Sequence, residues 1–94
     1  MKLEIPYQVA NNRDEAFDLV KEKIDPSFLS QFKLKIKIEF NKEKGFIEGT
    51  GKGFKASFIF QEDRCVVEIS LSFLLKPLSS KISKGLEEGL RSLL

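Results

Sequence analysis

Five lysines have the type and spacing that most readily suggest a chemistry, the binding of an anionic partner. Lys33, Lys35 and Lys37 alternate with apolar residues, and Lys52 and Lys55 extend the set. Alternation with a period of two places the first three on one face of a strand. A basic sheet face can bind RNA, single-stranded DNA or an anionic lipid. Nucleic-acid-binding sheets usually also present aromatic side chains for stacking, and here the aromatic residues are predicted to point inward, so a solvated face is favoured.

The glycine-rich segment Gly49-Thr50-Gly51-Lys52-Gly53 is the second candidate for binding a phosphate. It lacks the spacing of a phosphate-binding loop, and no helix is predicted to follow it. A strand against which another group packs closely is the favoured interpretation.

Residues suited to catalysis are scarce. The chain has no histidine, which removes the commonest general base and the commonest transition-metal ligand. No pair of carboxylates has a spacing that indicates acid–base catalysis. We therefore expect a protein that is not an enzyme, with no catalytic residue, no cofactor and no metal.

Cys65 is the only cysteine, so no internal disulfide can form. At the start of a predicted strand it is expected to be a small core residue. No apolar run reaches the ~20 residues that cross a bilayer. The first residues lack the apolar region of a signal peptide, and we expect a cytoplasmic protein.

The elements that would position these residues follow from hydrophobic periodicity. Residues 2–9 alternate as a strand, and Pro6 favours a sheet edge. Asn12 followed by Glu15 predicts a capped helix, expected over 13–24. Pro26 predicts a further short helical turn. Alternation then predicts four more strands, and leucine spacing predicts a long final helix that starts between Leu74 and Ser80; the predicted strands cover 34–40, 46–52, 54–60 and 65–73.

The predicted order of elements is β-α-β-β-β-β-α. Four consecutive strands with short connections indicate an antiparallel meander. Both helices should cover its apolar face. The fold class is therefore α+β, with two layers and an antiparallel sheet of four to five strands that carries helices on one face. At 94 residues, 1–94 is expected to be a single domain.

The final helix supplies a candidate apolar or partner surface. Leu86 and Leu90 lie at helical spacing, and the chain ends in Leu93-Leu94. Gly85 and Gly89 are four residues apart, at a cost of roughly 1–2 kcal/mol in helix propensity. Close packing of the helix backbone on the sheet would offset that cost. The alternative is a homodimer through the glycine face.

Phenylalanine occurs nine times. A filled aromatic core is favoured, and a cavity for an apolar ligand is the alternative. On the outer face of the sheet, Ile59 and Val66 are expected to be neighbours. Six of the phenylalanines are predicted to share the interior: Phe17, Phe40, Phe54, Phe58, Phe60 and Phe73.

Nearly the whole chain resembles the polyhydroxyalkanoic acid system (granule-region) family. The resemblance rests on Ile5, the helix over 13–24, the Gly49–Phe54 segment and the Glu62-Asp63 turn, with Cys65-Val66-Val67-Glu68-Ile69 and Leu74-Leu75. Many members carry a histidine near the end of the first strand, where this chain has Tyr7. The resemblance implies an association with storage-polyester granules and no catalytic residues.

Three functions remain open from the sequence. The first is a non-catalytic binding protein for an apolar ligand or granule surface. The second is a nucleic-acid-binding domain that uses the five lysines. The third is a homo-oligomeric interaction module.

Overall fold

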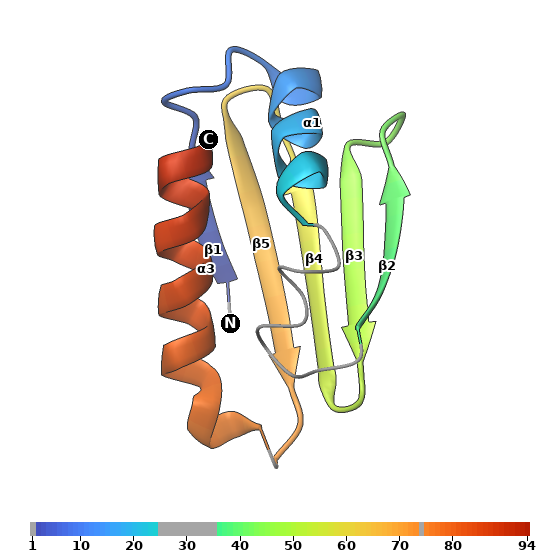
Figure 1. Cartoon of the computed structure of the whole chain (residues 1–94), viewed down its shortest axis with the longest axis vertical. Helices are drawn as coiled ribbons and strands as arrows, with labels where there is room; N and C mark the ends of the chain where they lie inside the picture. Colours follow the sequence, from blue (N-terminus) through green and yellow to red (C-terminus); the bar gives the residue numbers. More distant parts are fainter. Residues whose placement is uncertain (1, 25–35, 74) are drawn as a thin grey trace.

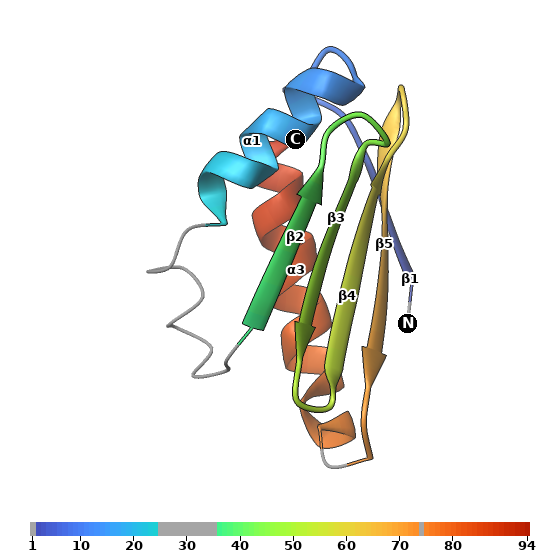
Figure 2. The ribbon, with the colours of Figure 1, turned by 90° about the vertical axis from the view of Figure 1, so that its right-hand side faces the viewer.

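A five-stranded antiparallel sheet carries two helices on one of its faces (Figures 1 and 2). The computed structural model describes residues 2–24, 36–73 and 75–94. The strand order is β1-β5-β4-β3-β2. This confirms the predicted α+β fold and the predicted order of elements. The elements are β1 (Lys2–Pro6), α1 (Arg13–Lys23), β2 (Ile36–Asn41), β3 (Phe46–Gly51), β4 (Phe54–Phe60), β5 (Arg64–Leu71), the 3-10 helix η1 (Lys76–Leu78) and α3 (Ser79–Leu93).

Alternate residues of each strand form the core beneath the helices. Ile5 pairs with Cys65, and Cys65 pairs in turn with Phe60, so these three lie side by side on the inner face. Val67 and Ile47 both flank Phe58 in the neighbouring row. Because successive strand residues point to opposite faces, this one register buries the inward row of every central strand.

Helix α1 begins at its predicted cap. The Asn12 side chain accepts a hydrogen bond from the Glu15 N–H at 2.8 Å. The Glu15 carboxylate contacts the Asn11 side-chain amide, at 3.3 Å, so the capping box is half formed. The helix buries Ala16, Phe17 and Val20 against the sheet. The Phe17 ring meets that of Phe60 edge to face, at 5.6 Å between centroids.

Helix α3 starts within the predicted window and runs beside β1 (Figure 1). Its Leu90 and the following Leu94 are buried. The backbone oxygen of Leu94 accepts hydrogen bonds from the N–H groups of Gln8, Val9 and Ala10. This contact fixes the end of α3 to the loop between β1 and α1.

Two expectations about packing are wrong. Phe73 is 85% exposed rather than interior, and Phe40 is 41% exposed. Gly85 and Gly89 do not lie against the sheet, since a Cβ added at either would meet nothing within 4 Å among the described residues. Both glycines face outward, because the buried side of α3 is the side that carries its leucines.

Candidate binding surface at the basic end

Two chain connections meet at one end of the sheet. The β3–β4 turn contains Gly53, whose φ of +77° favours glycine. The oxygen of Gly53 accepts a hydrogen bond from the N–H of Ser72 at 2.7 Å. A Cβ at Gly53 would come within 2.5 Å of the Ser72 Oγ and 3.7 Å of the Leu75 side chain. The turn and the connection between β5 and η1 are therefore packed together (Figure 1).

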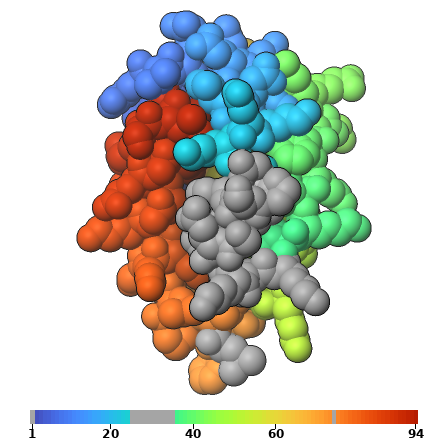
Figure 3. All heavy atoms as spheres, viewed as in Figure 1, coloured from blue at the N-terminus to red at the C-terminus, as the bar shows by residue number. Residues whose placement is uncertain are grey.

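This connection exposes two large apolar side chains. Strand β5 ends at Leu71, and a tight turn follows in which the Leu75 N–H donates to the Ser72 oxygen at 3.0 Å. Phe73 lies within that turn and is 85% exposed, because strand β5, which would bury it, has already ended. Leu78, at the end of η1, is 48% exposed. Figure 3 shows this connection and the start of α3, in orange, at the lower end of the molecule.

Three exposed lysines lie on the connections at the same end of the sheet as the two apolar side chains. Lys52 lies in the β3–β4 turn, Lys76 in η1 and Lys81 in the first turn of α3, and all three are exposed. None of the three has an ion-pair partner within the described part of the chain. Lys55, near the start of β4, lies 3.8 Å from Glu48. We call the set Lys52, Lys55, Phe73, Lys76, Leu78 and Lys81 the basic end.

The sequence around the basic end contains no carboxylate. Neither residues 49–61 nor residues 69–86 include an Asp or a Glu. At the opposite end of the molecule, basic residues are paired with acidic ones: Arg64 contacts Asp63 at 3.1 Å, and Lys42 contacts Asp18 at 2.9 Å. The Arg64 guanidinium also lowers the pKa of Asp63. A net charge of only +2 therefore conceals an uneven distribution.

The lysine row expected on the outer face is only partly continuous. Lys37 and Lys55 flank Thr50 in one cross-strand row, whereas Lys33 and Lys35 lie outside the described residues. The next row along the strands is acidic, with Glu48 between Glu39 and Ser57. The outer face is thus banded in charge rather than uniformly basic.

A third row of the outer face is apolar. Ile59 pairs with Val66, as expected, and also with Phe46. Val66 is only 7% exposed. Phe46 is the one aromatic residue in the outward rows of the described strands. A nucleic-acid-binding sheet usually carries several aromatic residues.

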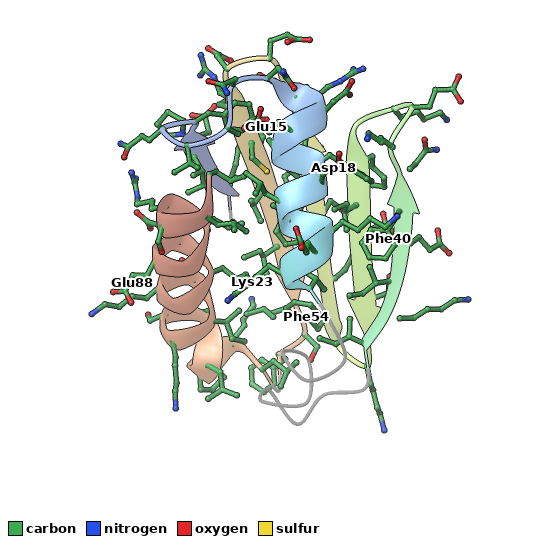
Figure 4. All side chains as sticks on the ribbon, turned by 45° about the horizontal axis from the view of Figure 1, so that its top comes forward. Glu15, Asp18, Lys23, Phe40, Phe54 and Glu88 are labelled. Carbon is green, nitrogen blue, oxygen red and sulfur yellow. The ribbon has the colours of Figure 1, made fainter. Side chains whose placement is uncertain are left out.

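The tail leucines lie mainly inside. Leu90 and Leu94 are buried, and Leu86 and Leu93 pack against the core at its margin. They hold α3 in place and leave little apolar surface for a partner. Gly85 and Gly89 lie on the outward side of the same helix. Figure 4 shows Glu88, from that exposed side, directed away from the rest of the molecule.

The exposed apolar residues at the basic end were not predicted. The available signal was the acid-free stretch 69–86, which carries Lys76, Lys81 and Lys84 beside a proline. Periodicity alone continued the last strand to Phe73, since nothing in the alternation marks Leu71 as its end.

Two side chains that could react when ionised, Cys65 and Tyr7, are held in their protonated forms. Burial raises the pKa of the Cys65 thiol to about 12. Burial also raises the pKa of the Tyr7 phenol, which donates a hydrogen bond to the Gln61 oxygen at 2.7 Å. Neither group is therefore ionised near neutral pH. The described residues include no group of three acidic, cysteine or histidine side chains that could hold a metal ion.

No helix in the described segments is long and apolar enough to cross a membrane. No protein-family model matches this chain, and no curated protein or solved structure shows significant similarity to it. The polyhydroxyalkanoic acid system family suggested by the sequence therefore stays a hypothesis.

Proposed function

We propose that this protein is a non-catalytic cytoplasmic binding protein that attaches to an apolar interface with negative surface charge. The basic end is the contact surface. A storage-polyester granule is the interface suggested by the family resemblance. A cytoplasmic location suits the free thiol of Cys65.

The exposure of Phe73 is the observation that carries the proposal. A single exposed apolar residue on a protein surface is ordinary. Phe73, however, shares one end of the molecule with the exposed Leu78 and with three lysines that have no ion-pair partner among the residues described. Apolar side chains that enter an interface and lysines that remain at its charged surface are the two components of peripheral attachment.

The energies of the two components are comparable. Burial of a phenylalanine or leucine side chain stabilises attachment by roughly 1.5–3 kcal/mol. Each lysine near an anionic surface adds about 1 kcal/mol. The lysine contribution falls as salt screens it, so attachment should require both components at physiological salt.

Flotation with vesicles tests the proposal. We expect the protein to float with phosphatidylcholine vesicles that contain phosphatidylglycerol, and much less with phosphatidylcholine alone. Purified polyester granules in the same gradient test the suggested interface. Granules that bind no protein while anionic vesicles bind it would remove the granule from the proposal and keep the interface.

Matched variants locate the contact surface. Phe73→Ser combined with Leu78→Ser should reduce flotation about tenfold or more, and Lys76→Glu should also reduce it. Val9→Ser is the control for an apolar residue, because Val9 is 56% exposed in the β1–α1 loop. Lys44→Glu, in the β2–β3 loop, is the control for charge. Equal losses for the controls and the basic-end variants would contradict the proposal.

Nucleic-acid binding is a separate outcome of the same variants. The electrophoretic mobility of labelled single-stranded RNA at low salt measures this binding. A mobility shift that the Phe73→Ser variant still causes and the Lys37→Glu variant does not would favour the sheet face as a nucleic-acid site instead.

A further inference from the structure

We propose that the free edge of β2 pairs with the same edge of a second copy of this chain. The two sheets would join across a two-fold axis into one continuous sheet of ten antiparallel strands. This pairing uses neither the basic end nor the glycines of α3, so it is independent of the function proposed above.

Strand β2 is the last strand of the described sheet on its side. The strand order ends with β3-β2, and Figure 2 looks onto this edge. Four of its six residues are exposed: Lys37, Glu39, Phe40 and Asn41. Phe40 makes an edge contact with Phe17, at 6.5 Å between ring centroids, and still leaves 41% of its surface exposed.

The direction of the backbone groups of β2 follows from the ladder. The Phe60 N–H donates to the Gly45 oxygen at 2.8 Å. Because hydrogen-bonded residues alternate in antiparallel pairs, the odd-numbered residues of β3 bond to β4 and its even-numbered residues bond to β2. By the register of β2 with β3, Lys37 and Glu39 then bond inward. The N–H and C=O groups of Ile36, Ile38 and Phe40 point away from β3.

Within Ile36–Asn41, only one two-fold register sets opposite charges against each other. With Ile38 opposite Ile38 of the second copy, Lys37 faces Glu39 of that copy, and the symmetric pair repeats the contact. A shift of the axis to residue 39 would oppose two Glu39 side chains, and a shift to residue 37 would oppose two Lys37 side chains. Like charges directly opposite one another destabilise a strand pair.

The register centred on Ile38 also lets the outward-pointing backbone N–H and C=O groups of β2 form hydrogen bonds. It places Ile38 in a hydrogen-bonded pair with its copy and Ile36 in such a pair with Phe40, which gives about six new backbone hydrogen bonds. The side chains of these three residues share the helix-bearing face. Phe40 would thus gain Ile36 of the second copy as an apolar neighbour on its exposed side.

A lysine on an edge strand ordinarily discourages pairing with another chain. Here Glu39 lies two residues from Lys37 on the same face. Lys37 and Glu39 together therefore disfavour the registers centred on residue 37 or 39, whereas they favour the self-complementary register centred on Ile38.

Charge reversal tests the pairing. We expect sedimentation velocity of the unmodified protein to show a dimer that dissociates on dilution. Lys37→Glu alone, or Glu39→Lys alone, should raise the dissociation constant about tenfold or more, since each creates two like-charge contacts. The double variant Lys37→Glu with Glu39→Lys should restore the dimer. A monomer at all concentrations, or a dimer that either single variant leaves unchanged, would overturn the proposal.

A disulfide cross-link tests the register directly. Opposed residues of a hydrogen-bonded antiparallel pair have Cα atoms about 5.5 Å apart, which a disulfide spans. Ile38→Cys should form a covalent dimer on mild oxidation. Asn41→Cys, on the same exposed strand but far from its copy in this register, is the control. Cross-linking that is faster at residue 41 than at residue 38 would refute the register.

Discussion

Cys65 and Tyr7 illustrate how local surroundings decide what a reactive side chain can do. Cys65 is fully buried between β1 and β4, opposite Ile5 and Phe60. Burial disfavours the charged thiolate, and its pKa rises to about 12. Tyr7 is half-buried and engaged with the Gln61 oxygen. Both residues therefore contribute to stability through packing and hydrogen bonding in their protonated forms.

The thiol of Cys65 should be unreactive in the folded protein. At pH 8 we expect an aromatic disulfide reagent to modify it at least a hundredfold more slowly than in the protein unfolded in guanidinium, since both burial and protonation protect it. The absorbance of the released thiol measures the rate. Equal rates in the two states would show that residue 65 is accessible.

Alkaline pH should destabilise the fold. Because the folded-state pKa of Cys65 lies above its ordinary value of 9.0, the folded protein holds this proton more tightly than the unfolded chain does. The free energy of unfolding should be constant below about pH 9 and fall as the pH rises toward 12. Cys65→Ala should weaken this decline, as chemical denaturation at several pH values would show. Tyr7, whose pKa is also raised, would account for the remainder.

Helix α3 shows most clearly that one element has two sides with different energetic roles. Leu90 is 6% exposed on the inner side, whereas Gly85 and Gly89 are exposed on the outer side. The fifteen residues of the helix extend over roughly 22 Å. Its position beside β1 is held by leucine packing and by the hydrogen bonds to Leu94 rather than by close approach of the glycines.

Substitutions on the two sides should have opposite signs. Gly85→Ala and Gly89→Ala should each raise the free energy of unfolding by about 0.5–1 kcal/mol, because alanine favours the helix and its Cβ meets no described atom. Leu90→Ala should lower it by about 2–5 kcal/mol. Urea denaturation measures all three.

The glycine variants also test the third function suggested by the sequence. If the Gly85–Gly89 face formed a homodimer, an added methyl group would weaken it. We expect the combined variant Gly85→Ala with Gly89→Ala to keep the association state of the unmodified protein, as sedimentation velocity would report. Dissociation by this variant would favour the glycine face over β2.

At the scale of the whole molecule, lysines without a described acidic partner and paired charges lie at opposite ends of the sheet. The basic end has an exposed phenylalanine and three lysines, Lys52, Lys76 and Lys81, that lack an acidic partner among the described residues, and the opposite end has paired charges. The proposed dimer would reverse one copy relative to the other, since paired β2 strands run antiparallel. Its two basic ends would then point in opposite directions.

This geometry predicts that the dimer bridges two interfaces. The unmodified protein should cluster anionic vesicles and raise their turbidity. Glu39→Lys, which opposes the dimer and removes no positive charge, should bind the vesicles without clustering them. If a variant shown to be monomeric still clustered the vesicles, vesicle bridging would not depend on β2 pairing.

The sequence by itself determined the type, order and inward faces of nearly all the described elements. Period-two alternation defines which side of a strand is apolar, and the Asn12–Glu15 spacing supplies a local helix start. These signals are local, so they can be recognised without knowledge of the rest of the chain. The neighbouring positions of Ile59 and Val66 followed from the same alternation combined with a short turn.

Only the tertiary structure decided where the strands stop and what gathers at their ends. Alternation placed Phe73 in the core, but the hydrogen bond of Ser72 to Gly53 is the last one of the β4–β5 ladder, and the turn closed by the Leu75 N–H on the Ser72 oxygen leaves Phe73 exposed. The tertiary structure likewise brought the turn at Gly53 against Ser72 and Leu75, which belong to a separate connection, and left β2 at an edge of the described sheet. Such juxtapositions depend on contacts between distant parts of the chain, which periodicity along one segment does not encode.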